Sequence, residues 1–146
     1  MEQTMSINMK SNVGQRGATL LEALIGILIF SVGILALVGM QAIAIKQMTD
    51  AKYRSDASFF ANEIIGHMWV HRGSLNSYNF GGTGTPPPAL TSWVTSIQNG
   101  LPGVADAANT LPIVSVVGTT VTVTVRWLVP GGATAHRHLT LAYING

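Results

Sequence analysis

The sequence predicts an α+β fold in which a long N-terminal transmembrane helix packs its C-terminal half on a small antiparallel β-sheet. Three observations lead to this prediction. The stretch from Ala23 to Ile45 contains no charged residue and no proline. Apolar residues then recur at helical spacing as far as about residue 72. The C-terminal part of the 146-residue chain instead alternates apolar and polar residues, which is typical of β-strands.

The first segment predicts a membrane span. A helix from Ala23 to Ile45 would be roughly 34 Å long, and the hydrocarbon core of a bilayer is about 30 Å thick. A cleavable secretory signal has a shorter apolar region that is followed by small residues at the cut. Here the basic Arg16 and the small Gly17 come before the apolar run. We therefore expect residues 18–45 to remain in the chain as the transmembrane half of a long helix.

The second half of this helix carries one apolar stripe. Residues three and four apart share a helix face, so the stripe needs a partner surface. Its members are Ala57, Phe60, Ala61, Ile64, Ile65, Met68 and Trp69. Gly73 follows the last periodic residues and predicts the end of the helix at about residue 72.

The remaining segments predict the rest of a small domain over residues 46–146. Residues 73–89 are rich in glycine, serine and proline, which predicts a loop. Residues 90–101 have amphipathic helical spacing and end at Pro102-Gly103. Three strands within about 111–145 follow as an antiparallel meander. We expect the valines of the second strand and the leucines of the third (Leu139, Leu141) to face the helix stripe.

Composition excludes several classes of function. The formal net charge is +2 and the basic residues are scattered, which argues against a nucleic-acid interface. The chain has no cysteine, and therefore neither a disulfide nor a thiolate metal site. His67 and His71, and likewise His136 and His138, are paired on one face, but no acidic residue supports them as metal ligands. No phosphate loop, nucleophile elbow or acid pair is visible, so we expect no enzyme activity, no cofactor and no metal.

The N-terminal edge of the apolar run carries one carboxylate. Glu22 lies in the segment Arg16-Gly17-Ala18-Thr19-Leu20-Leu21-Glu22. A carboxylate in a membrane span costs about 2.5 kcal/mol or more unless it is paired or near the interface. Glu22 therefore needs a cationic partner, unless it is only a chance acidic residue at the end of an ordinary anchor.

This segment resembles the processing site of type IV prepilins and pseudopilins, in which a short basic leader ends in glycine before a helix whose fifth residue is glutamate. The resemblance implies that residues 1–17 are a leader peptide, cut between Gly17 and Ala18 by a prepilin peptidase that then methylates the Ala18 amine. It also implies an assembly role for Glu22, whose carboxylate would pair with the Ala18 amine of a subunit. Weaker similarities at residues 31–41, 54–68 and 121–127 are most like minor pilins of the type IV pilus modification subfamily.

The resemblance implies a structural subunit that primes assembly of a type IV pilus. Its partners would be other minor pilins, the major pilin, the prepilin peptidase, the inner-membrane assembly platform and a tip adhesin. The domain of residues 46–146 would be periplasmic, anchored in the bacterial inner membrane before it enters the pilus near its tip. Two alternatives stay open: a minor pseudopilin of type II secretion, and a single-span membrane-anchored binding module that never polymerises.

Overall fold

The computed structural model describes residues 15–145, so Met1 to Gly14 of the expected leader lie outside the described residues. The chain divides into two compact units, with the boundary between Lys46 and Gln47. The first unit contributes only helix to the described residues. The second contains a helical segment and a three-stranded antiparallel sheet, which confirms the α+β class.

Helix α1 spans Gln15–Val70. Its described part therefore already includes Gln15, Arg16 and Gly17, ahead of the predicted start at Ala18. A single glycine costs a helix only about 1 kcal/mol relative to alanine, which is too little to stop the helix at this point. At the other end, His71 (φ −106°, ψ 33°) leaves the helical conformation, before the predicted end.

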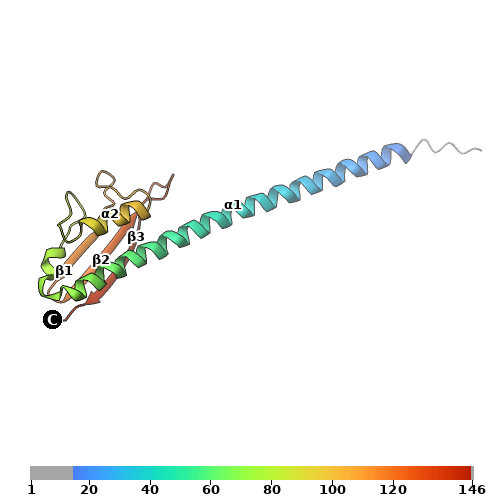
Figure 1. Ribbon diagram of the computed structural model, residues 1–146. Coiled ribbons are helices and arrows are strands. Elements are labelled where there is room, and N and C mark those ends of the chain that lie inside the picture. The colour runs from blue at the N-terminus through green and yellow to red at the C-terminus, as the bar shows by residue number, and fades with distance from the viewer. Residues whose placement is uncertain (1–14, 146) are drawn as a thin grey trace, which may run out of the picture. The chain divides into compact units, whose positions relative to one another are not determined.

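The sheet is a meander of three strands in the order β1-β2-β3, which lie side by side in Figure 1. Strand β1 spans Ile113–Val117, β2 spans Thr120–Trp127 and β3 spans His136–Tyr143. A two-residue connection joins β1 to β2, and its first residue, Gly118, has φ 61°. A positive φ at this position is the requirement of a type II′ hairpin turn, which glycine meets without strain.

Two short helices complete the second unit (Figure 1). The amphipathic helix predicted over 90–101 is α2, which spans Thr91–Gly100. The predicted loop over 73–89 is wrong in its first part, because the 3₁₀-helix η1 spans Arg72–Tyr78. Phe80, just after η1, forms an antiparallel bridge with Val114 of β1.

One hydrophobic core joins α1, α2 and the sheet. Trp93 of α2 is nearly buried, and its indole Nε1 donates a hydrogen bond of 2.9 Å to the Phe60 carbonyl of α1. The α1 members of the core are Ala57, Ala61, Ile64, Ile65 and Met68, and the β2 members are Val121, Val123, Val125 and Trp127. Most of the predicted stripe is therefore correct, but Trp69 is wrong, because 45% of it is exposed.

The prediction for the third strand is wrong as well. Leu139 and Leu141 are 56% and 49% exposed, so they do not face the helix. The register places Leu141 opposite Thr122, and Leu139 opposite Thr124, on the face of the sheet away from the core. Residues directly opposite each other on paired strands share a face. Since the valines of β2 face inward, their threonine neighbours and the leucines of β3 face outward.

Candidate processing and assembly segment

The predicted processing residues Gly17 and Ala18 and the predicted assembly residue Glu22 all lie in α1. Ala18 and Glu22 are exposed. They are four residues apart and so lie on one face of the helix, one turn from each other. A Cβ added at Gly17 would meet no atom within 4 Å. Within the described part of a single chain, space therefore does not require glycine at this position.

The peptide bond between Gly17 and Ala18 lies in helical backbone. Gln15, the first described residue, is already helical. A peptidase that cuts extended backbone would therefore have to unwind the helix at this bond.

The carboxylate of Glu22 has no ionic partner in the described chain. The one ion pair among the side chains of residues 17–145 joins Lys52 and Asp56, with an N–O distance of 2.7 Å. Glu22 itself is exposed and is followed by the apolar run. An acidic group at this position is tolerated in a membrane or a dry helix interface when a cation faces it or when it lies near the aqueous boundary.

From Ala23 to Ile45, the helix presents exposed apolar side chains on every side. A helix that is hydrophobic all round belongs in a membrane or inside a larger assembly. Among the described residues, one helix is long and apolar enough to cross a membrane, and its most apolar window has no buried residue. Its exposed large apolar residues up to residue 48 are Leu20, Leu21, Leu24, Ile25, Ile27, Leu28, Ile29, Phe30, Val32, Ile34, Leu35, Leu37, Val38, Met40, Ile43, Ile45 and Met48.

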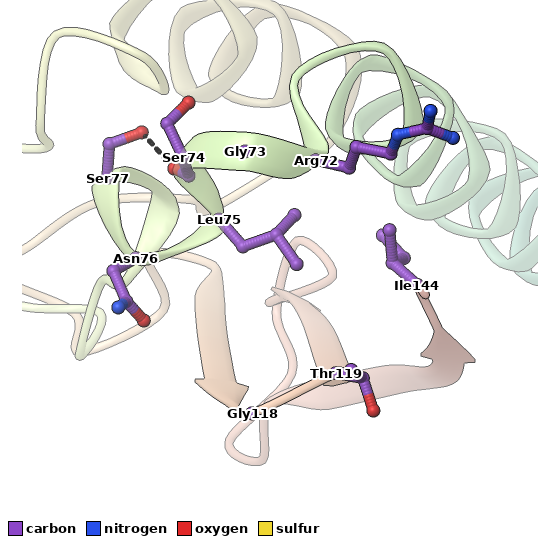
Figure 2. A pocket seen from close by; sticks show the side chains of 9 residues that line it. All are labelled: Arg72, Gly73, Ser74, Leu75, Asn76, Ser77, Gly118, Thr119 and Ile144. Atoms are coloured by element: carbon purple, nitrogen blue, oxygen red, sulfur yellow. Dashed lines mark hydrogen bonds between the residues drawn. The ribbon is translucent and has the colours of Figure 1, made fainter. Parts of the chain in front are cut away.

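A cleft of about 440 Å³ opens in the second unit, beside η1 and the β1–β2 turn. In Figure 2, Leu75 points toward the space between Thr119 and Ile144, and the guanidinium of Arg72 extends away from Leu75. The Ser77 hydroxyl donates a hydrogen bond of 2.7 Å to the Ser74 carbonyl. The lining contains two large apolar side chains, Leu75 and Ile144, beside several polar ones, and no acidic side chain of the described residues lines the cleft. This arrangement offers no general acid–base pair.

A second cleft, of about 250 Å³, lies between α1 and α2. Glu63 and His67 line one side, and Ser92 and Ser96 the other. Ser96 is tied to its own helix, since its Oγ donates a hydrogen bond of 3.1 Å to the Ser92 carbonyl. Within residues 15–145, neither the carboxylate nor the imidazole of this cleft bonds to a serine hydroxyl. The cleft therefore lacks the hydrogen-bonded chain that activates a serine nucleophile.

The four histidines are not gathered at one place. His67 and His71 are exposed near the end of α1, where the Nδ1 of His71 lies 3.0 Å from the His67 carbonyl. On β3, His136 stacks on Trp127 with ring centroids 5.6 Å apart, and the Nε2 of His138 lies 3.0 Å from the Thr140 hydroxyl. Residues 15–145 contain no group of three or more potential metal ligands.

Comparison of the chain with models of protein families, with curated proteins and with solved structures finds no match in any of the three.

Proposed function

We propose that the chain is a minor pilin that is processed after Gly17 and takes part in priming the assembly of a type IV pilus. One observation carries the proposal: Gly17, a small residue after it, and a Glu22 without an ion pair in residues 17–145 precede the uncharged, exposed stretch 23–45 of a helix. The exposed apolar surface suits two successive environments, the lipid of the inner membrane and the helix-packed centre of a filament.

The Glu22 carboxylate supplies the electrostatic reason for assembly. Cleavage creates an ammonium at Ala18, one helical turn from Glu22. In a dry interface between helices, either charge alone is strongly destabilising, whereas the pair is tolerated. When helices of neighbouring subunits are staggered along their axes, the amine of one subunit can meet the carboxylate of another. Assembly then satisfies both groups, and the protein acts as a structural subunit without catalytic turnover.

The processing step is tested by replacing the glycine. Gly17→Phe should leave an uncut precursor in cells that contain an active prepilin peptidase, because the bulky side chain occupies the position before the cut. Gly14→Phe is the matched control and should be cut normally. Intact-mass measurement distinguishes the two products. A wild-type chain that keeps Met1 to Gly17 in those cells would contradict the proposal.

The assembly step is tested at the carboxylate. Glu22→Gln should insert into the membrane and be cut normally, since removing a charge makes insertion easier. It should then be missing from sheared pili, or reduce their number, because the Ala18 ammonium has lost its partner. Glu63→Gln, on the same helix but in the folded domain, should leave pili unchanged. Normal pili that contain normal amounts of the Glu22→Gln variant would favour a membrane-anchored binding module instead.

A minor pseudopilin of type II secretion shares the same cleavage motif and is the closest alternative. The two functions differ in where the subunit is found. Quantifying the chain in purified pili, and measuring secretion by cells that lack it, separates them: a pilin is present in pili and its loss leaves secretion intact.

A further inference from the structure

The two edges of the sheet differ in whether their outward-facing backbone groups form hydrogen bonds. At the outer edge of β1, the Val114 N–H donates to the Phe80 carbonyl at 3.0 Å and its carbonyl accepts from the Phe80 N–H at 2.8 Å. The Val116 N–H donates to the side-chain Oδ1 of Asn79 at 2.8 Å. The opposite edge belongs to β3, and no backbone group of residues 15–145 pairs with it.

The hydrogen-bond pattern tells which β3 groups are free. In antiparallel sheets, successive residues point their N–H and C=O to opposite sides of the strand. The backbone N–H and C=O groups of Val114 and Val116 point away from β2. The backbone groups of the β2 valines must therefore point toward β3, where they bond to even-numbered residues. The Ile144 N–H, which donates to the Thr119 carbonyl at 2.8 Å, follows the same alternation. Within the described chain, the free groups therefore belong to the odd-numbered residues Arg137, Leu139, Leu141 and Tyr143.

These same four residues carry exposed side chains. Leu139, Leu141 and Tyr143 are 56%, 49% and 64% exposed, although all three are large and apolar or aromatic. The strand has eight residues, contains no proline, and pairs with β2 residue by residue without a bulge. Natural edge strands are usually protected by prolines, bulges, several charges or a covering segment. Arg137 is the only charged residue of β3.

The charge of this edge indicates what would bind there. Arg137 stands between His136 and His138, and none of the three forms an ion pair within the described chain. The strand has no acidic residue. A second copy of β3 paired along this edge would therefore bring no carboxylate to the cationic end. A strand from another protein can bring one.

We propose that the free edge of β3 binds an extended segment of another protein, which adds a fourth strand to the sheet. This partner strand has apolar side chains at alternate positions, to cover Leu139 and Leu141, and a carboxylate opposite Arg137. Backbone hydrogen bonds provide most of the affinity in such strand addition, and the alternate side chains provide the specificity. The inference goes beyond the proposed function and does not depend on filament formation.

The test uses the full chain in lipid nanodiscs and a fluorescein-labelled synthetic peptide. The peptide has valine at alternate positions, threonine between them, and one aspartate placed to face Arg137. We expect saturable binding by fluorescence anisotropy. Methylating the peptide nitrogens that face the edge should weaken binding by about tenfold or more, because donors to β3 are lost. Methylating the alternate nitrogens, which face away, is the matched control and should leave binding unchanged.

Variants of the chain locate the site. Leu141→Pro removes an N–H that points to the free edge and none that points to β2, so it should abolish peptide binding while circular dichroism is kept. Arg137→Ala should weaken binding of the aspartate peptide but not of an asparagine peptide. Val117→Ala, an exposed residue on β1, should change nothing. If Leu141→Pro fails to fold, comparing the two methylated peptides on the unchanged chain still tests the proposal.

Two results would overturn the proposal. One is the absence of saturable binding, or equal binding of both methylated peptides. The other is efficient disulfide crosslinking between two copies that carry Leu139→Cys, in a chain that otherwise has no cysteine, because the edge would then be occupied by a second copy. Neither result depends on whether Gly17 is cut or Glu22 is needed for pili.

Discussion

The two parts of helix α1 have opposite relations to their surroundings. Between residues 20 and 48, the large apolar side chains are all exposed, with exposed fractions from 46% for Ile34 to 75% for Leu35. Between residues 57 and 68, one face of the helix is apolar and buried, with Ala57 and Met68 at 0%. The distribution of apolar residues around a helix thus indicates its surroundings. A helix with one apolar face packs that face on a surface such as the sheet of this chain, whereas a helix that is apolar on all faces is covered by lipid or by other subunits.

The largest expected difference between the two parts is in the stability of the domain. Ile64→Ala should lower its free energy of unfolding by about 2–5 kcal/mol, because it leaves a cavity in the core that includes β2. Leu35→Ala removes the same kind of side chain from the exposed part and should leave that free energy unchanged. Urea unfolding of the detergent-solubilised chain, followed by tryptophan fluorescence, measures both. Equal effects would mean that the two parts are not distinct.

An added charge should affect the first part of α1 and not the second. Leu35→Arg should make membrane insertion less favourable by about 3 kcal/mol, since an arginine at the centre of a span must be desolvated. Val70→Arg places the same charge at a residue that is 78% exposed in the other part and should not affect insertion. The fraction of chain recovered in carbonate-washed membranes gives the result. Loss of Val70→Arg from that fraction would contradict the assignment of the span.

The smallest effect is expected near the junction of the two parts. Lys52 Nζ donates a 2.7 Å hydrogen bond to Asp56, and this bond raises the pKa of Lys52 above its ordinary value of 10.5. A raised lysine pKa means that the pair stabilises the fold at neutral pH. This contribution is lost as the pH rises above 10.5 and through the raised pKa. Because the lysine is at the surface, Lys52→Met should leave the melting temperature at pH 7 within error. A clear decrease would show a stronger pair than surface geometry allows.

Local patterns predicted the elements of this fold, and long-range pairing decided what they left open. The alternation of β3 predicts a strand but gives two faces, one with leucines and one with histidine and threonine. Hydrophobicity alone predicts that the leucines of β3 are buried, yet Leu141 pairs with Thr122 and is exposed. The register between β2 and β3 determines which face of β3 is buried, and the sequence of β3 alone does not specify this register.

The same limit applies to the two candidate sites. The candidate processing segment could be proposed from the sequence because Gly17, Ala18 and Glu22 lie within a few residues of one another. The free edge of β3 could not, since it depends on the order of three strands and on what covers the other edge. Helix η1 was missed for a similar reason: its residues look like a loop, and it is followed by Asn79, which bonds to a strand 37 residues away.

The contacts of Asn79 and Phe80 with β1 have a consequence for the order of folding. The β1–β2 hairpin closes through a two-residue turn, whereas the bond from Val116 to Asn79 closes a loop of 37 residues. Longer loops cost more entropy to close, so contacts across them form later than local ones. We therefore expect the meander to form first and to have two unpaired edges until the segment after η1 docks. During that interval, refolding at high protein concentration should favour association between chains over completion of the fold.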